Sequence, residues 1–268
     1  MPLPAPSESG IALVTGASSG IGAATARELA ARGYGVVLVA RREDRLRGLA
    51  GEIDRDRGVR AETLAADLAA AGARDLLVSR LDELGLDVEI LVNNAGFGAY
   101  GAGHELERER LVEMVRANCE ALVDLQARFA PAMVARGRGA ILNVASTAAF
   151  QPLPGSACYA ATKAFVLSLT EATHAELHGS GVAVTALCPG PVWTEFATVA
   201  GVGRQERQLP RLFWSSAEAV AREAVEGLAK DKRVVIPGLL NRAGAVGGQH
   251  APRALVLPIA DRIRRAAL

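Results

Sequence analysis

Tyr159 and Lys163 stand four residues apart in a stretch whose apolar spacing predicts a helix over residues 157–177. Residues at this spacing lie one above the other on one helix face, so a phenol and an ammonium would stand side by side. An ammonium beside a phenol favours the phenolate and lowers its pKa from about 10 toward neutral pH. Ser146 follows an apolar strand predicted over residues 140–145, in place to donate a hydrogen bond to a carbonyl oxygen. Together the three side chains predict proton transfer to or from a carbonyl substrate.

The tyrosine–lysine spacing alone leaves a second interpretation open. In that interpretation the phenol packs in the fold and the lysine extends from a surface helix. Of the 30 basic residues, however, only Lys163, Lys230 and Lys232 are lysines. An ammonium is a compact charge that a guanidinium does not replace, so a lysine kept at this position favours the functional interpretation. Ser156 is predicted to cap the start of the helix.

A glycine-rich turn near the N-terminus predicts a phosphate site. A strand predicted over residues 11–14 runs into Thr15-Gly16-Ala17-Ser18-Ser19-Gly20-Ile21-Gly22, and an amphipathic stretch follows to about Arg32. Glycines let the backbone approach an anion, and the helix N-terminus offers unpaired N–H groups and a favourable dipole. The absence of Gly-Lys-Ser/Thr excludes the loop of nucleotide triphosphatases. A merely tight strand-to-helix turn is the alternative.

Two arginines follow the second predicted strand and indicate which dinucleotide would bind. Dinucleotide folds read the ribose 2′-hydroxyl with an acidic residue at this point, whereas arginine accommodates a 2′-phosphate. Ala40 ends the strand, and Arg41 and Arg42 come next. This pattern favours NADP(H), with NAD(H) also possible. Because Glu43 and Asp44 follow, a solvated helix start remains the alternative.

The order of predicted elements indicates an α/β protein. Strands are predicted at residues 11–14, 35–40, 59–65, 88–92, 140–145, 182–187 and 233–236. Beyond the helix after the glycine turn, helices are predicted at residues 43–56, 70–84, 107–136, 157–177 and 216–230. Such alternation forms a parallel sheet with helices on both faces. The fourth strand ends in Asn93-Asn94-Ala95-Gly96, which belongs in the ligand crevice beside the glycine turn.

Two segments lack a clear pattern. Residues 195–215 show no periodicity and are predicted to form a substrate loop. Residues 239–268 form a C-terminal extension that packs over the substrate mouth, joins a subunit interface or touches a membrane as an amphipathic helix. No linker or repeat interrupts the chain, so residues 1–268 are predicted to form one domain.

Composition excludes several classes of partner. Half of the residues are apolar and the net charge is +1, which argues against nucleic acid as a partner. Cys119, Cys158 and Cys188 lack metal-ligand spacing and are expected to be free thiols, so no metal site is predicted. Residues 1–10 do not resemble a signal peptide, and no apolar run is long enough to span a bilayer. The protein is therefore expected to be cytoplasmic, with membrane contact unexpected.

These motifs, taken in order, resemble the short-chain dehydrogenase/reductase family. The resemblance runs from about residue 11 to residue 236. It rests on Thr15-Gly16-x-x-x-Gly20-x-Gly22, Asn93-Asn94-Ala95-Gly96, Ser146, Tyr159-x-x-x-Lys163 and Pro189-Gly190. It implies a Rossmann-like, doubly wound parallel sheet of about seven strands in the order 3-2-1-4-5-6-7. It also implies a homodimer or homotetramer formed through the two long helices.

The resemblance also implies roles for individual residues. The implied catalytic residues are Asn118, Ser146, Tyr159 and Lys163. The implied cofactor-binding residues are Gly16, Ser18, Ser19, Gly20, Ile21, Gly22, Arg41, Arg42, Asp67, Asn93, Ala95, Gly96, Tyr159, Lys163, Pro189, Gly190, Val192 and Thr194. Ser19 departs from the family pattern, because many NADP-preferring members carry a basic residue there. Recognition of a 2′-phosphate would therefore rest on Arg41 and Arg42.

The predicted function is NADP(H)-dependent interconversion of a carbonyl and a secondary alcohol by hydride transfer. The substrate is expected to be a small-to-medium hydrophobic molecule that contacts Phe97, Phe150, Leu153 and Phe196, with Tyr100, Phe213 and Trp214 as further pocket candidates. A regulatory or scaffold protein that binds a dinucleotide without turnover is the alternative. The complete set of proton-transfer residues argues against that alternative, because a binding module needs only the glycines.

Overall fold

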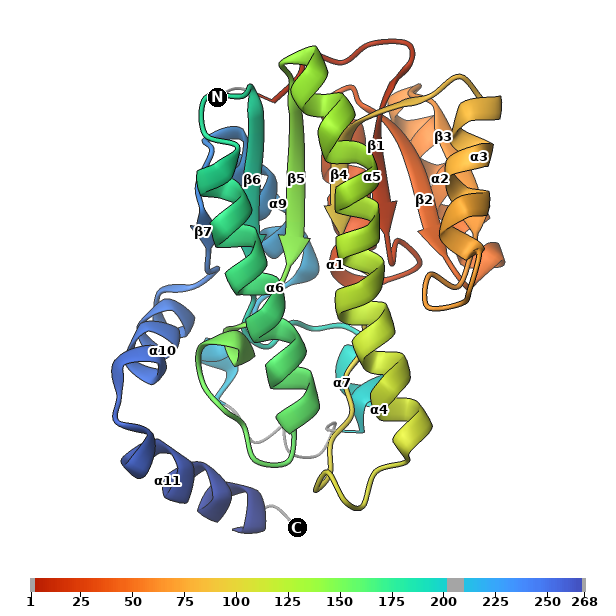
Figure 1. The fold of residues 1–268 in the computed structure, drawn as a ribbon. Helices are drawn as coiled ribbons and strands as arrows, with labels where there is room; N and C mark the ends of the chain where they lie inside the picture. The colour runs from red at the N-terminus through yellow and green to blue at the C-terminus, as the bar shows by residue number, and fades with distance from the viewer. Residues whose placement is uncertain (1–2, 202–209, 267–268) are drawn as a thin grey trace.

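A parallel sheet of seven strands runs through the middle of the protein, with helices against both faces (Figure 1). The structure, a computed structural model, describes residues 3–201 and 210–266. The strands are β1 (Gly10–Thr15), β2 (Gly35–Ala40), β3 (Ala61–Ala65), β4 (Asp87–Asn93), β5 (Gly139–Val144), β6 (Val182–Leu187) and β7 (Val234–Val235). Their order is β3-β2-β1-β4-β5-β6-β7, which confirms the predicted fold class and strand order.

Two layers of helices cover the sheet. The helices are α1 (Gly20–Ala31), α2 (Glu43–Arg57), α3 (Ala73–Glu83), α4 (Arg108–Val115), α5 (Ala121–Arg136), α6 (Ala157–Glu176), α7 (Phe196–Ala200), α9 (Ala217–Ala229), α10 (Leu239–His250) and α11 (Arg253–Ala266). In Figure 1, α3, α5 and α6 lie in front of the sheet, and α1, α2 and α9 lie behind it. None of the described helices is both long enough and apolar enough to cross a bilayer.

Successive side chains of the buried strands point alternately into the two core layers, one on each face of the sheet. Ile11 and Leu13 of β1 pack with the α3 and α5 side, whereas Ala12 and Val14 pack with the α1, α2 and α9 side. This is the two-residue period of a strand whose two faces are both buried. The strands point toward the end of the sheet where α7 and α10 lie, so residues that follow strands gather there (Figure 1).

The long helix predicted over residues 107–136 is interrupted. A single π-helical turn, Arg116–Glu120, separates α4 from α5, and Asn118 lies within it. Turns of this kind are rare in proteins overall, but those that do occur often lie at functional sites. Periodicity does not reveal them, because one extra residue in a helix shifts the apolar pattern only slightly.

Smaller differences have local causes. The helix predicted to begin at residue 70 begins at Ala73, because Gly72 adopts a left-handed conformation with φ of 74°. Ser156 occupies the predicted N-cap position of α6, but its side chain does not cap the helix. Ser216 does cap α9, and its side chain accepts a hydrogen bond from the backbone N–H of Ala219 at 3.1 Å.

The segment predicted as an irregular loop over residues 195–215 contains regular structure. It includes α7 and a short 3₁₀ turn, Arg211–Phe213, although residues 202–209 lie outside the described part of the chain. The C-terminal extension forms α10 and α11. Arg253 fastens α11 to the body of the protein by donating hydrogen bonds to the carbonyls of Gly248 and Phe150.

Candidate active site

A cavity of about 750 Å³ lies at the carboxyl end of the sheet. Most residues singled out from the sequence line it. These are Gly16, Ser18, Ser19, Gly20, Ile21, Arg41, Arg42, Asp67, Ala95, Gly96, Phe97, Ser146, Leu153, Tyr159, Lys163, Pro189, Gly190, Val192, Thr194, Phe196 and Phe213. Residues that follow β1 to β6 thus meet at one edge of the sheet, because the carboxyl ends of parallel strands lie at the same edge.

Four residues that the sequence predicted for the site do not line the cavity: Gly22, Asn93, Asn118 and Phe150. Gly22 packs behind the turn, where a Cβ would stand 2.5 Å from the carbonyl oxygen of Gly16. Phe150 is buried in the apolar cluster around α6. Tyr100 and Trp214, the further candidates, also lie outside the lining.

Asn93 turns into the sheet rather than toward the crevice. Its amide donates to Asn143 Oδ1 at 2.9 Å, and Asn143 in turn donates to Gln126 and Thr170. The side chain of Asn93 therefore does not line the cavity. Asn94 lines the cavity instead and donates to the carbonyls of Thr15 and Gly16 at 2.9 and 3.3 Å.

The glycine turn and the Asn94 loop support each other closely. Gly16 has a positive φ of 66°, and a Cβ there would stand 2.6 Å from Asn94 Nδ2. Thr15 Oγ1 accepts hydrogen bonds from the backbone N–H groups of Asn94 and Ala95. At the start of α1, no side chain caps the helix and no acidic residue lies in the first turn. Its N–H groups and dipole therefore present a positive end for an anion.

Tyr159, Lys163 and Ser146 meet at the wall of the cavity. Lys163 is 5% exposed, its Nζ donates to the Val144 carbonyl at 2.8 Å, and it lies 5.8 Å from the centre of the Tyr159 ring. Burial lowers the pKa of Lys163 to about 8, since water no longer stabilises the charge. Ser146 Oγ accepts from the N–H of Ala148 at 3.0 Å, a bond that leaves its hydroxyl hydrogen to donate.

Asn118 acts behind this wall. In the π-helical turn, its Oδ1 accepts from the N–H of Phe97, and its Nδ2 donates to the Phe97 carbonyl and to Thr162 Oγ1, all at 3.0 Å. The Thr162 hydroxyl donates to the carbonyl of Tyr159 at 2.8 Å. Asn118 therefore fixes the loop after β4 against the helix that carries Tyr159 and Lys163. Gly96 is needed beside it, because a Cβ would stand 2.7 Å from Asn118 Oδ1.

Arg42 lies over the glycine turn. Its guanidinium donates to Ser18 Oγ from Nε and Nη2, at 3.2 and 3.0 Å, and to Ser19 Oγ from Nη2 at 2.8 Å. Arg41 is more exposed, and its nearest charged partners are Asp67 at 4.0 Å and Glu113 at 3.7 Å. Of the two arginines, Arg42 is the one that the turn itself orients.

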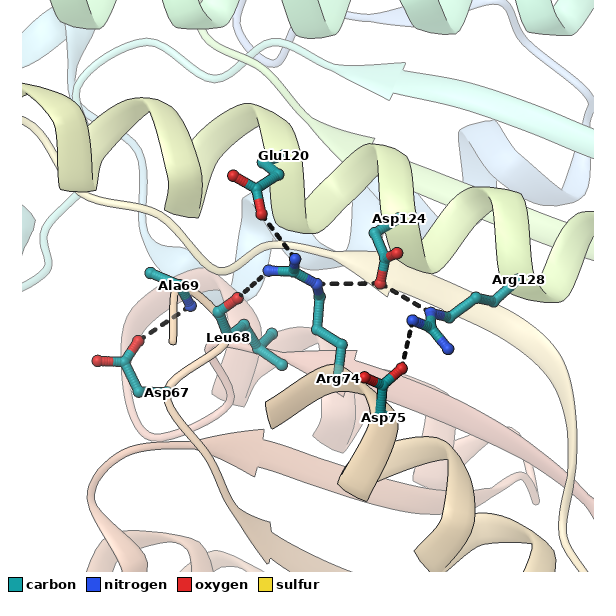
Figure 2. Close-up of polar contacts among 8 residues, drawn as sticks. All are labelled: Asp67, Leu68, Ala69, Arg74, Asp75, Glu120, Asp124 and Arg128. Atoms are coloured by element: carbon teal, nitrogen blue, oxygen red, sulfur yellow. Dashed lines mark hydrogen bonds and ion pairs between the residues drawn. The ribbon is translucent and has the colours of Figure 1, made fainter. Parts of the chain in front are cut away.

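The loop that carries Asp67 is fastened to α5 by Arg74 (Figure 2). Arg74 donates to the carbonyl of Leu68 at 2.6 Å, to Asp124 at 2.9 Å and to Glu120 at 2.7 Å. Asp67 Oδ1 accepts from the N–H of Ala69, which fixes the turn itself. One signal in the sequence points to this contact, namely the charged residues Glu120, Asp124 and Arg128 along one face of the long helix.

The cavity has two halves of different character. The polar half follows β1 to β4, and the described charged residues Arg41, Arg42, Asp67 and Glu113 line it. The apolar half follows β5 and β6 and extends to α10. Its described lining is Phe97, Gly98, Ala99, Ala148, Gln151, Leu153, Ser156, Tyr159, Phe196, Ala197, Val199, Ala200, Phe213, Leu240, Asn241, Gly244 and Ala245. Lys163, at the boundary of the two halves, and Glu195, beside Arg42, are the other described charged residues of the cavity lining, and the apolar set contains none.

Two helices of the apolar half lie in segments that the sequence placed near the substrate without predicting their helical form. α7 brings Phe196 to a ring-centre distance of 5.5 Å from Tyr159. α10 brings Leu240, Asn241, Gly244 and Ala245 to the wall, so one part of the C-terminal extension packs over the cavity, the first of the three predicted alternatives. Asn241 holds α10 in place by donating to the carbonyls of Phe213 and Pro237.

Comparison with known proteins agrees with this geometry. A family model described as short chain dehydrogenase matches residues 10–204. Sulfoacetaldehyde reductase 2 from Chromohalobacter salexigens is 38% identical over 199 residues, which cover 74% of this chain and 78% of that protein.

Two solved structures extend the comparison over nearly the whole chain. A short-chain dehydrogenase from Sphingobium yanoikuyae in complex with NADPH is 35% identical, with a TM-score of 0.78 and coverage of 96% of this chain and 94% of that one. A bulky-bulky ketone specific alcohol dehydrogenase from Comamonas testosteroni is 30% identical, with a TM-score of 0.76 and coverage of 97% and 94%. The chain belongs to the short-chain dehydrogenase family and is an oxidoreductase.

Proposed function

We propose that this protein interconverts a neutral, apolar ketone and its secondary alcohol with NADP(H). The observation that carries the proposal is the position of Tyr159, Lys163 and Ser146 at the boundary between the polar and apolar halves of one cavity. A dinucleotide in the polar half and a carbonyl in the apolar half would meet at these side chains.

The polar half fits a dinucleotide. The uncapped N-terminus of α1 suits the pyrophosphate, and Asp67 and its loop suit the adenine end. Arg42, with Ser18 and Ser19 beside it, suits a 2′-phosphate, because a guanidinium binds phosphate oxygens through paired N–H groups. The NADPH complex of the Sphingobium relative supports the same choice of cofactor.

The proposed chemistry divides between cofactor and protein. The nicotinamide supplies or accepts the hydride. In reduction, the Tyr159 hydroxyl gives its proton to the carbonyl oxygen, and in oxidation the phenolate takes the alcohol proton. Lys163 stabilises the phenolate by its charge, and Ser146 donates a hydrogen bond to the substrate oxygen. Asn118 acts by position, since it holds α6 against the loop after β4.

The lining of the apolar half supports a neutral substrate. The named substrate of the Chromohalobacter relative, sulfoacetaldehyde, carries a sulfonate. An anion of this kind needs a cationic partner when it is desolvated, and the described lining of the apolar half offers none. The name of the Comamonas relative instead specifies bulky ketones.

Turnover assays with paired substrates test the proposal. NADPH oxidation is followed with bulky neutral ketones, and with small ketones and 3-oxo acids as comparisons. We expect the highest kcat/KM with the bulky neutral ketones, and little activity when NADH replaces NADPH. Preference for an anionic substrate would overturn the substrate class, and preference for NADH would overturn the cofactor choice.

We also propose a homo-oligomer formed through α4, α5 and α6. Val112, Val115, Val123 and Phe165 on these helices are partly exposed, each between 38% and 45%. Apolar side chains gathered on adjacent helices favour association of copies. Light scattering after size-exclusion chromatography should give a dimer or tetramer mass, and a monomer mass would contradict the proposal.

A further inference from the structure

Glu195 joins two sides of the cavity that are distant in sequence. It follows Thr194 and immediately precedes α7. Its Oε2 lies 2.7 Å from Nη1 of Arg42, and its Oε1 lies 2.7 Å from Nη1 of Arg45. The two guanidiniums hold the pKa of Glu195 below its usual range. The start of α7 is thereby tied to the start of α2 by ion pairs.

The other end of α7 is held differently. Arg110 donates to the carbonyls of Val199 and Gly98 at 2.9 and 3.4 Å, and the N–H of Tyr100 donates to the Ala200 carbonyl at 3.0 Å. All of these acceptors are neutral backbone carbonyls. The Glu195 end, in contrast, is held by ion pairs between charged side chains, so an anion that binds Arg42 competes directly with Glu195.

Arg42 is the point where a second anion would arrive. Its contacts in the described structure are the hydroxyls of Ser18 and Ser19 and the carboxylate of Glu195. A serine hydroxyl turns readily from accepting to donating, so both serines are able to donate to a phosphate. A carboxylate only accepts, and its charge repels a phosphate at the same guanidinium. Glu195 is therefore the partner that a phosphate must displace.

We propose that Glu195 occupies the 2′-phosphate position as an internal anion and is displaced from Arg42 when NADP(H) binds. The inference rests on the proposed NADP(H) function and adds a specificity-determining residue to it. Displacement breaks one of the two ion pairs that hold the N-terminal end of α7, which carries Phe196 against Tyr159, and leaves the pair between Glu195 and Arg45. NAD(H) lacks the displacing group and would leave the tie intact. The 2′-phosphate would thus act on the substrate half of the site, far from its own contacts.

Two fluorophores report on this event. Trp193 and Trp214 are the only tryptophans in the chain, and their rings stack with centres 4.1 Å apart. The N–H of Trp193 donates to the carbonyl of Ser215 at 3.1 Å, and Glu195 lies two residues further along the chain. Neither ring lines the cavity, so a ligand changes their emission by moving this segment.

The experiment compares adenosine 2′,5′-bisphosphate with adenosine 5′-monophosphate, which differ only in the 2′-phosphate. Binding is measured by calorimetry, and tryptophan emission is recorded in the same titrations. The variants are Glu195→Gln and the control Glu83→Gln. Glu83 also loses a 2.8 Å ion pair with an arginine, but it lies on α3 away from the cavity.

We expect only the bisphosphate to change the wild-type emission. Glu195→Gln should bind the bisphosphate about twofold to fivefold more tightly than wild type, the range expected for release from an exposed ion pair. It should bind the monophosphate unchanged and show a reduced emission change. Glu83→Gln should match wild type.

Two other outcomes separate the inference from the function it rests on. If the bisphosphate binds more tightly than the monophosphate but Glu195→Gln matches wild type in affinity and emission, the role of Glu195 is wrong and the NADP(H) function stands. If the bisphosphate binds no more tightly than the monophosphate, both the assignment of Arg42 to a 2′-phosphate and the displacement of Glu195 are overturned.

Discussion

The polar and apolar halves of the cavity are built in different ways. The polar half comes from short connections that directly follow β1 to β4, and buried bonds such as those of Asn94 and Thr15 hold it. The apolar half comes partly from the segments after β4 and β5, and partly from α7, a 3₁₀ turn and α10, which lie beyond β6 and join the site over longer stretches of chain. Recognition of the cofactor thus depends on the sheet, whereas recognition of the substrate depends on added segments. Substrate recognition can change in these added segments while the sheet stays the same, and the pair of Glu195 with Arg42 is a contact that links the two halves.

Loss of the Tyr159 hydroxyl should have the largest effect, because this group serves both halves. Tyr159→Phe should lower kcat by roughly 10²- to 10⁴-fold, the usual contribution of a positioned acid–base group. The affinity for NADPH, measured by calorimetry, should change little. Tyr100→Phe is the matched control, since Tyr100 lies outside the cavity lining. Full turnover by Tyr159→Phe would remove the proposed proton donor.

Arg42→Ala should weaken cofactor binding in the polar half, and it also removes one of the two ion pairs that hold Glu195. It should weaken NADPH binding by about 10- to 100-fold, the range for hydrogen bonds to a charged group, and leave NADH binding nearly unchanged. Arg41→Ala should also weaken NADPH more than NADH, but by less, because Arg41 is more exposed and lies near Asp67 and Glu113. Equal losses for both cofactors would show that neither arginine reads a 2′-phosphate.

Lys163→Met, at the boundary of the two halves, should make the protein more stable and at the same time less active. Burial lowers the pKa of Lys163 from 10.5 to about 8. Below pH 8 the lysine is charged in both states, but only in the folded state is this charge buried away from water, which costs stability. The variant should unfold with a free energy higher by about 1 to 3 kcal/mol at pH 7, and turnover should be lost.

The pH dependence of this difference follows from the sign of the shift. Between about pH 8 and 10.5, the unfolded wild type binds the proton that the folded state has released. Wild-type stability therefore rises with pH in this window relative to the variant, and the advantage of Lys163→Met shrinks. Urea unfolding of the wild type and of Lys163→Met at pH 7, 8, 9 and 10 measures the difference between their free energies of unfolding. A constant difference between the two proteins would contradict the lowered pKa.

Gly244→Val should act on the apolar half alone and has the smallest expected effect. Gly244 lines the cavity, and a Cβ there meets no atom within 4 Å, so valine would narrow the site without a clash. We expect kcat/KM for bulky ketones to fall about tenfold relative to small ketones, with NADPH affinity unchanged. Gly247→Val, on the same helix, also has open space but lies outside the lining. If both variants shift selectivity equally, α10 does not shape the substrate.

The sequence was sufficient for the polar half because its signals are local. Strand ends, the glycine turn and paired arginines are each read within a few residues, and the parallel sheet brings them together. Asn93 stays outside the cavity lining because of its face of the strand, since adjacent residues point to opposite sides. The strand register alone decides which asparagine reaches the crevice.

In the apolar half, the sequence predicted lining residues such as Leu153 and Phe196, but not the form or the placement of α7 and α10, for physical reasons. α7 has only five residues, too few for a periodic pattern, and tertiary contacts at both of its ends hold it. The placement of α10 depends on bonds such as those from Asn241 to Phe213 and Pro237. Contacts of this kind join segments that carry no mutual signal in the sequence, and the same holds for the ion pairs of Glu195.

Transfer of deuterium from labelled cofactor tests the central claim most directly. The protein is incubated with a bulky neutral ketone and NADPH that carries deuterium at C4 on one face or the other, and the product is analysed by mass spectrometry. We predict deuterium on the carbinol carbon from one of the two labelled cofactors, with one alcohol formed for each NADPH consumed. Binding of NADPH without deuterium in any product, across neutral ketones of all sizes, would contradict the account and leave a dinucleotide-binding protein without turnover.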